Sequence, residues 1–303
     1  MNNDRIQEIL DLMEEARLDY FLISDPQSIA YCTGYYNDPH ERMFVFMISK
    51  HGNHTLFMND LFYLDHDLDV NIVWHKDGQD AIQTIVDEMH FPGRIGIDKN
   101  WASHFLLDLM KKLPDAKYIN ASPCVDLVRM KKDLQEQVLM IESSKINDAV
   151  MEEIIPFIQE GVTEKQLAKK LDELFFKHHS TCYGAIVAFG KNAADPHHEN
   201  DDTLLRKGDC VLIDMGCVYK GYCSDMTRTF FYEGILEEEI KVYEIVKKAN
   251  EAAEAMIKPG VKLSDIDKCA RKVISDEGYG KYFTHRLSLI HISEPTRPEP
   301  ISY

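Results

Sequence analysis

The sequence predicts a two-domain protein, an α/β domain followed by an α+β domain. The chain of 303 residues is long enough for two domains of roughly 150 residues each. Its hydrophobic content of 45% is sufficient for sizeable cores and argues against disorder over most of the chain. Helix and strand patterns alternate in the first part, whereas in the second part helices come first and strands follow. These two orders are typical of α/β and α+β domains respectively.

The first part alternates between helical and strand patterns. Apolar residues recur at helical spacing between Ile6 and Met13 and predict an opening helix. Ser122-Pro123 signals a loop, so we place the end of this domain at residue 126. Between these points, short apolar runs predict strands at 20–23, 43–48, 55–58, 71–74, 94–97 and 117–119, and periodic stretches predict helices at about 79–89 and 102–112.

The second part, from residue 127, begins with a long helical pattern over about 134–159. Pro156 is expected to kink or shorten this helix, and Gly161 suits the cap that follows it. Thr163 and Gln166 form a capping box for the next helix, which is predicted to run to about residue 176. Beyond it, strands are predicted at 185–189, 211–214 and 227–232, and helices at about 236–257 and 265–276.

Net charge and cysteine content exclude several classes of partner and location. The formal net charge is −17, and phosphate binding needs clustered Lys and Arg, which argues against nucleic acid or an anionic membrane as the main partner. No run approaches the roughly 18 apolar residues of a membrane span, and the first residues show no signal-peptide pattern. The seven cysteines are odd in number and form no C-x-x-C pair, which predicts reduced thiols and a cytoplasmic protein.

The most informative stretch is 211–231, in which two strand patterns flank a turn signal at Lys220-Gly221. Such a hairpin would bring Asp214 and Asp225 together in a way that depends on the turn. A two-residue turn at Tyr219-Lys220 places the two side chains directly opposite each other. A two-residue turn at Lys220-Gly221 leaves them diagonal on one face, and a three-residue turn places them on opposite faces.

The pair Asp214 and Asp225 carries a chemical signal that has two interpretations. Two carboxylates on one buried face repel each other unless a cation neutralises them. Carboxylate oxygens are hard ligands, so divalent cations such as Mn²⁺ would suit them, and two cations about 3.5–4 Å apart could share the pair. The structural alternative is that Asp214 ends a strand and Asp225 caps a turn. His197 and His198, in the loop before this stretch, could be ligands, substrate contacts or plain surface residues.

Three sequence runs, in this order and spacing, resemble one known family. IVAFGKNAADPHH stands at 186–198, LIDMGCVYKGYCSDMTRTFF at 212–231 and YFTHRL at 282–287. Together they resemble the Xaa-Pro dipeptidase and aminopeptidase P family, the creatinase-like group of pita-bread metallopeptidases. The resemblance runs from the N-terminus to about residue 287. It implies a creatinase-type N-terminal α/β domain followed by an α+β pita-bread catalytic domain.

The resemblance also implies roles for several residues. Asp214 and Asp225 would be the first two of five metal ligands, with Asp225 in contact with both ions. His197 would contact the substrate, and His285 would help to bind it around the scissile bond. Thr227 would be a hydrogen-bond partner of Asp225. The implied cofactors are two divalent metal ions, with manganese favoured and cobalt or zinc as alternatives. The implied reaction is hydrolysis of the bond before proline in small proline-containing peptides, by a homodimer.

The resemblance stops after residue 287. The family continues with a Gly-His-Gly-Ile-Gly run whose histidine, the third ligand, would stand at position 289, but Leu289 cannot ligate and His291 is two residues too late. The family's two glutamate ligands lie further on, whereas the later glutamates here stand among prolines, which disfavour strands. The run LSLIHISEPTRP resembles translated sequencing-adapter sequence. We therefore expect 288–303 to be foreign to the family, the catalytic domain at 127–287 to be incomplete, and this chain to be inactive.

Two other functions stay open. A creatinase or another carbon–nitrogen hydrolase would use the same fold, since pocket residues decide the substrate. A non-catalytic pita-bread module that binds peptides or proteins is the second alternative, which the leucine at 289 favours if the tail belongs to the protein. The presence of Asp214 and Asp225 favours the peptidase. The motifs G-x-S-x-G, H-E-x-x-H and G-x-G-x-x-G, which mark other hydrolases and nucleotide-binding proteins, are absent from the sequence.

Overall fold

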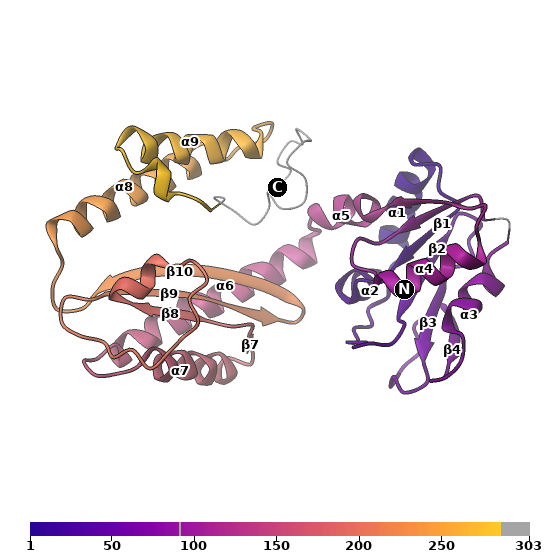
Figure 1. Ribbon diagram of the computed structural model, residues 1–303, viewed down its shortest axis with the longest axis horizontal. Coiled ribbons are helices and arrows are strands. Elements are labelled where there is room, and N and C mark those ends of the chain that lie inside the picture. The colour runs from indigo at the N-terminus through magenta and orange to yellow at the C-terminus, as the bar shows by residue number, and fades with distance from the viewer. Residues whose placement is uncertain (91, 286–303) are drawn as a thin grey trace. The chain divides into compact units, whose positions relative to one another are not determined.

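The computed structural model describes residues 1–90 and 92–285, which form two compact units (Figure 1). The first unit is Met1–Lys131, and the second begins at Lys132. Each unit has hydrophobic cores of its own. No helix in the described part of the chain combines the length and the hydropathy that crossing a membrane requires.

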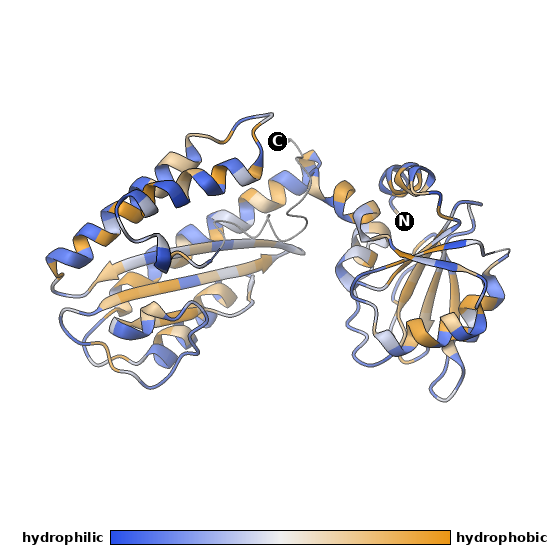
Figure 2. Cartoon of the chain, turned by 45° about the horizontal axis from the view of Figure 1, so that its top comes forward, coloured by the Kyte–Doolittle hydropathy of each residue, from blue (hydrophilic) through white to orange (hydrophobic). Residues whose placement is uncertain are grey.

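A six-stranded mixed sheet forms the centre of the first unit, in the order β4-β3-β2-β1-β5-β6. The β1–β5, β5–β6 and β3–β4 pairs are parallel, and the β1–β2 and β2–β3 pairs are antiparallel. Figure 2 shows these strands as mainly hydrophobic, as expected for a sheet that is covered on both faces. The strands are β1 (Tyr20–Ile23), β2 (Val45–Ser49), β3 (Thr55–Asn59), β4 (Asn71–His75), β5 (Arg94–Ile97) and β6 (Lys117–Asn120).

Helices cover both faces of this sheet. Ile6 of α1 (Asn3–Glu15), Ile29 of α2 (Pro26–Thr33) and Val125 of α5 (Ser122–Met130) belong to one core. Ile82 of α3 (Ala81–Glu88) and Leu109 of α4 (Ser103–Lys112) belong to the other. The sheet between two helical layers confirms the α/β class predicted for this part of the chain.

The end of the first unit differs from the sequence prediction. The loop predicted at Ser122-Pro123 is wrong, because both residues lie in the first turn of α5. Proline suits the first turn of a helix, where its missing N–H would have had no intrahelical acceptor. The boundary predicted at residue 126 falls inside α5, and the division between the units lies after Lys131.

The second unit is an α+β unit whose helices come first. Its antiparallel sheet has the order β10-β9-β7, and β8 also pairs with β9. Pro156 lies in a 3₁₀ turn and α6 ends at Ile154, as its position predicted. The capping box of Thr163 and Gln166 is confirmed at the start of α7. The elements are α6 (Leu134–Ile154), α7 (Glu164–Lys177), β7 (Thr181–Cys182), β8 (Ile186–Phe189), η2 (Gly190–Ala194), β9 (Cys210–Tyr219), β10 (Tyr222–Phe231), α8 (Glu237–Glu254), α9 (Leu263–Asp276) and η3 (Gly280–Tyr282).

Helices α6 and α7 cover one face of the β9–β10 hairpin. Val150 of α6 and Leu171 of α7 share a core with Ile213 and Met215 of β9. Ser143 of α6 fixes the hairpin further, since its hydroxyl lies 2.9 Å from the Ser224 hydroxyl and donates to the Tyr222 carbonyl at 3.1 Å. The side chains of alternate residues therefore point away from α6 and α7, toward the opposite face of the hairpin.

Candidate active site

The turn of the β9–β10 hairpin decides how its side chains are arranged. Tyr219 pairs with Tyr222, so the turn consists of Lys220 and Gly221. Both have positive φ, +48° and +84°, which is the signature of the type I′ turn that suits the twist of a hairpin. Of the three turns considered from the sequence, this is the one at Lys220-Gly221.

This register places Asp214 and Asp225 diagonally on one face of the hairpin. Asp225 lies opposite Gly216, and Asp214 lies opposite Thr227. The Thr227 hydroxyl donates a hydrogen bond of 2.7 Å to Oδ1 of Asp214. The expectation that Thr227 supports Asp225 is therefore wrong: the diagonal register gives its hydroxyl to the other aspartate.

The face that carries the two aspartates is the more open one. Asp225 is exposed and Asp214 is half-buried, whereas Ile213, Met215 and Cys217 on the other face are buried. The expectation that Asp214 and Asp225 share a buried face is therefore wrong in the described part of the chain. Helices α6 and α7 cover the other face of the hairpin, which carries Ile213 and Met215. Partial desolvation, and then the charge of Asp214, nevertheless raise the pKa of Asp225. Two hard oxygen donors that repel each other fit divalent cations.

Tyr183, just after β7, completes this part of the site and was not recognised from the sequence. Its hydroxyl donates to the carbonyl oxygen of Ser224 at 2.7 Å, and it packs over Gly216, where a Cβ atom would collide with it. Desolvation raises the pKa of Tyr183, and the charges of Asp225 and Asp214 act in the same direction. The tyrosine therefore stays a neutral hydrogen-bond donor beside the carboxylates. Register alone could have suggested a neighbour for Gly216, but not which residue.

The two predicted site histidines lie together. The ring centroids of His197 and His285 are 6.5 Å apart in an edge-to-face arrangement, although the residues come from distant parts of the chain. Both side chains are exposed. Arg271 of α9 holds the segment that carries His285, since its guanidinium donates to the carbonyl oxygens of Phe283 at 2.7 Å and of His285 at 3.1 Å.

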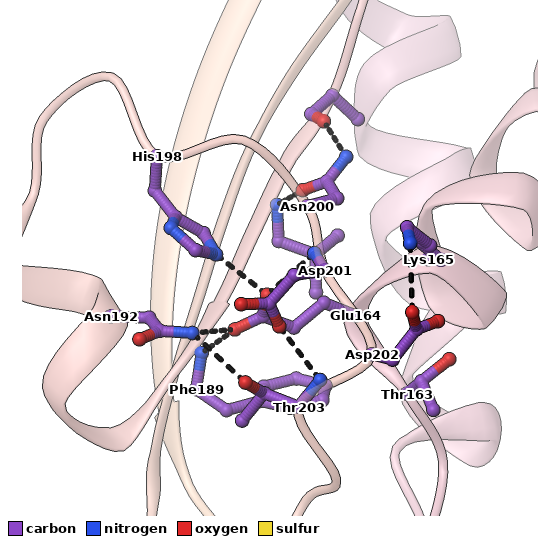
Figure 3. Close-up of polar contacts among 12 residues, drawn as sticks. Thr163, Glu164, Lys165, Phe189, Asn192, His198, Asn200, Asp201, Asp202 and Thr203 are labelled. Carbon is purple, nitrogen blue, oxygen red and sulfur yellow. Dashed lines mark hydrogen bonds and ion pairs between the residues drawn. The ribbon is translucent and has the colours of Figure 1, made fainter.

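A second group of ligand-type atoms lies around Glu164, at the start of α7 (Figure 3). Carboxylate or imidazole atoms of Glu164, His198 and Asp201 lie within 4.8 Å of one another, which is close enough to surround a metal ion. However, four protein groups already form hydrogen bonds with the two carboxylate oxygens of Glu164. A cation would have to replace several of them, so the group is better described as a hydrogen-bonded cluster. Leu289, His291 and the segment 288–303 lie outside the described residues.

Family models match both units of the chain. Residues 138–292 match the model of metallopeptidase family M24, and residues 5–131 match the model of the creatinase/prolidase N-terminal domain. The two matches follow each other in the order that the sequence resemblance implied. The match to the creatinase/prolidase N-terminal domain ends at residue 131, where the first structural unit also ends.

Individual relatives agree with these models. An uncharacterized peptidase from Staphylococcus aureus is 31% identical over 93% of this chain and 82% of its own length. The crystal structure of a dipeptidase from Pyrococcus horikoshii matches with a TM-score of 0.84 and 34% identity, over 93% of this chain and 80% of that one. A prolidase from Thermococcus sibiricus gives a TM-score of 0.87 and 29% identity over 94% and 80%, and an Xaa-Pro dipeptidase from Bacillus anthracis gives 0.83 and 27% over 93% and 80%. The chain thus spans about four fifths of the length of each of these relatives.

Proposed function

The chain belongs to metallopeptidase family M24, and from this premise we propose that its parent chain is an exopeptidase that hydrolyses the bond before proline. By parent chain we mean a chain in which residues 1–287 are followed by the remainder of the family's catalytic domain, with its histidine and two glutamate ligands. The substrates would be small proline-containing peptides, cleaved as by an Xaa-Pro dipeptidase or an Xaa-Pro aminopeptidase. Support comes from the similarity of this chain to the solved structures of a prolidase and of an Xaa-Pro dipeptidase.

The observation that carries this proposal is the diagonal pair of Asp214 and Asp225 on the open face of the hairpin. These carboxylates would hold two divalent cations, together with ligands from the further part of the family's catalytic domain. The cations, when bound, would supply Lewis-acid activation of water and of the scissile carbonyl. We propose manganese as the first candidate, with cobalt or zinc as alternatives.

The chain's own residues would then bind and orient the peptide. The proposed role of His197 is to contact the substrate, and that of His285 is to bind it around the scissile bond. Their edge-to-face contact supports this assignment because it brings two hydrogen-bonding imidazoles to one place. Thr227 holds the carboxylate of Asp214 in one orientation, and the neutral hydroxyl of Tyr183 fixes the backbone at Ser224. We further propose a homodimer in the cytoplasm.

The first prediction separates the parent chain from the 303-residue chain. The parent chain with Mn²⁺ is expected to release proline from Xaa-Pro dipeptides or the first residue from longer Xaa-Pro peptides. The 303-residue chain is expected to do neither and to bind Mn²⁺ weakly, because position 289 is a leucine. Proline release, measured by chromatography, and metal content, measured by mass spectrometry, test both statements.

Each contrary outcome has a distinct meaning. Robust turnover by the 303-residue chain with two tightly bound ions would show that 288–303 belongs to a working enzyme. Turnover of creatine but not of Xaa-Pro peptides by the parent chain would favour the carbon–nitrogen hydrolase. Peptide binding without hydrolysis of either substrate would favour the non-catalytic module.

A second prediction concerns Thr227, whose hydroxyl donates to Asp214. Thr227→Val keeps the shape of the side chain but removes the donor, so the carboxylate loses its fixed orientation. We expect roughly 10- to 100-fold weaker Mn²⁺ binding by the parent chain, measured by isothermal titration calorimetry. Thr229→Val, on the same face of β10, is the matched control and should leave the affinity unchanged. Equal affinities for Thr227→Val and the wild type would contradict the proposed role.

A further inference from the structure

Glu164 has an unusual environment for a carboxylate. Its side chain is fully buried, with an exposed fraction of 0%. Burying a charged carboxylate is costly unless donors replace the lost water. Here Oε1 accepts from the backbone N–H of Phe189 at 2.8 Å and from the Asn192 amide at 2.9 Å. Oε2 accepts from the backbone N–H of Asp201 at 3.1 Å and lies 2.6 Å from Nε2 of His198.

These partners come from both ends of one loop (Figure 3). Phe189 ends β8 and Asn192 lies in the 3₁₀ turn that follows, whereas His198 and Asp201 lie on the returning part of the loop. A single carboxylate at the first turn of α7 therefore ties the outgoing and the returning halves of the loop to the helix. We call the segment 190–203 the histidine loop, because it carries His197.

Other hydrogen bonds tie the base of the histidine loop to the residues around it. The Asn200 side chain accepts from Val187 N at 2.7 Å and donates to the Ala185 carbonyl at 2.7 Å, both next to or within β8. The Asn192 amide also donates to the Thr203 hydroxyl at 3.2 Å. These contacts hold residues at the two ends of the loop, while His197 lies between them.

His197 is adjacent in sequence to one of the groups that Glu164 holds. Its backbone N–H donates to the Asp195 side chain at 3.0 Å, a contact within the loop itself. Its ring contacts that of His285. The tie from the His198 ring to Glu164 is therefore the nearest anchor between His197 and the buried core of the unit.

We propose that Glu164 is a positioning residue for His197, acting through the histidine loop. This inference rests on the proposed function insofar as His197 contacts the substrate. The carboxylate suits this place because three of its partners offer it N–H groups, and Nε2 of His198 offers a fourth in the tautomer that carries a proton there. A neutral amide at this place would turn its NH₂ group toward one of the two pairs of partners. It would then leave at least one backbone N–H, that of Phe189 or that of Asp201, without an acceptor.

The test uses Glu164→Gln, with Glu173→Gln as the matched control. Glu173 lies on the same helix and is exposed, with Lys170 at 3.0 Å, so its replacement removes the same charge without touching the loop. In ¹H–¹³C spectra of the 303-residue chain, we expect Glu164→Gln to shift or broaden the imidazole signal of His197, assigned with His197→Gln. Amide exchange in 190–203 should become roughly 10- to 100-fold faster, since a buried charge-assisted anchor is lost. Glu173→Gln should change neither.

An unchanged His197 signal in Glu164→Gln would overturn the proposal, even if the signal of His198 moves. If Glu164→Gln does not fold, His198→Ala decides, because it removes one partner and leaves the other three donors on the carboxylate. It should move the His197 signal in the same direction. An unmoved signal in that variant would overturn the proposal as well.

Turnover by the parent chain adds a readout that a merely structural role would not move. Glu164→Gln is expected to lower kcat by roughly 10- to 100-fold through misplacement of His197. In a His197→Ala background, Glu164→Gln should lower kcat only slightly further. If the two variants instead lower kcat independently, so that their fold-losses multiply, action through His197 would be contradicted. Absence of Xaa-Pro turnover in the wild-type parent chain would refute the proposed function, while the His197 signal would still decide whether Glu164 positions the loop.

Discussion

Asp225→Asn is expected to abolish the proposed activity of the parent chain and to stabilise the metal-free fold at the same time. The amide keeps the size of the carboxylate but loses the charge that would bind a cation. If the metal ions supply several kcal/mol to the transition state, the loss of kcat/KM is on the order of 10³-fold or more. Proline release and metal content of the purified variant, each compared with the wild type, measure this.

The opposite effect on stability follows from the charges on the open face. Partial desolvation and the charge of Asp214 raise the pKa of Asp225, so its ionised form is less favourable in the folded chain than in the unfolded chain. Removing that ionisation should raise the thermal midpoint of the metal-free 303-residue chain at neutral pH. The gain should shrink as the pH falls through the pKa of Asp225, because the wild-type carboxyl then becomes neutral as well.

Asp276→Asn is the control for both halves of this prediction. Asp276 is an exposed carboxylate at the end of α9, where it pairs with Lys272, so its replacement should change neither activity nor the thermal midpoint appreciably. An Asp225→Asn variant that retains turnover and two bound ions would refute the metal-ligand role. Loss of activity together with a lower midpoint in the metal-free state would instead show that Asp225 supports the hairpin itself.

The architecture could be predicted because it rests on local patterns. Apolar runs such as 55–58 and capping signals such as Thr163 with Gln166 act within a few residues, and both were found where they were predicted. The family and the order of its two domains were also confirmed, since the motifs that carry the resemblance are long. Helix α2 was missed although Asp25 caps it and Gly34 ends it with a φ of +80°. Its eight residues are too few for apolar residues to show a clear helical periodicity.

The β9–β10 hairpin shows where local signals end. Strands were predicted only at 211–214 and 227–232, yet pairing continues to Tyr219 and begins at Tyr222. Gly216 and Ser224 weaken the strand pattern, but pairing across the hairpin overrides their low propensity. The turn at Lys220-Gly221 was visible in the sequence and fixes the diagonal pair.

Contacts between distant elements could not be predicted in the same way. The openness of the aspartate face depends on which side α6 and α7 cover, and a single strand pattern does not specify that. Glu164 is similar, since its partners lie 25 to 37 residues further along the chain. From the sequence it was only an acidic residue in the first turn of a helix, where such residues are common.

Gly216→Ala should be the most damaging small substitution in the second unit, because the residue lies where three groups meet. It is opposite Asp225 in the hairpin, and the Tyr183 ring packs over it. A Cβ atom built there would fall far inside the contact distance of the Tyr183 hydroxyl and of the Ser224 carbonyl oxygen. The Ser224 oxygen is backbone, so it cannot move without opening the ladder between β9 and β10.

We expect Gly216→Ala to lower the free energy of unfolding by about 3 kcal/mol or more, at the upper end of the range for overpacking. Gly234→Ala is the matched control, since its nearest neighbour would lie 3.5 Å from the new Cβ and its backbone is not in the left-handed region. Urea denaturation of the 303-residue chain, followed by circular dichroism, compares the two variants. A loss below about 1 kcal/mol for Gly216→Ala would mean that the strands separate easily at this point.

The double variant Gly216→Ala/Tyr183→Ala identifies which obstacle matters. Removing the Tyr183 ring eliminates the side-chain collision but leaves the collision with the Ser224 carbonyl oxygen. The double variant should therefore recover only part of the free energy of unfolding that Gly216→Ala loses. Full recovery would show that Tyr183 alone demands glycine, and the backbone beside Asp225 would then be free to accept a side chain. With partial recovery, the close approach of the two strands is itself the constraint. The diagonal spacing of Asp214 and Asp225 would then depend on glycine, which has no side chain, at position 216. Metal binding by the parent chain should therefore fail in Gly216→Ala even where the fold survives.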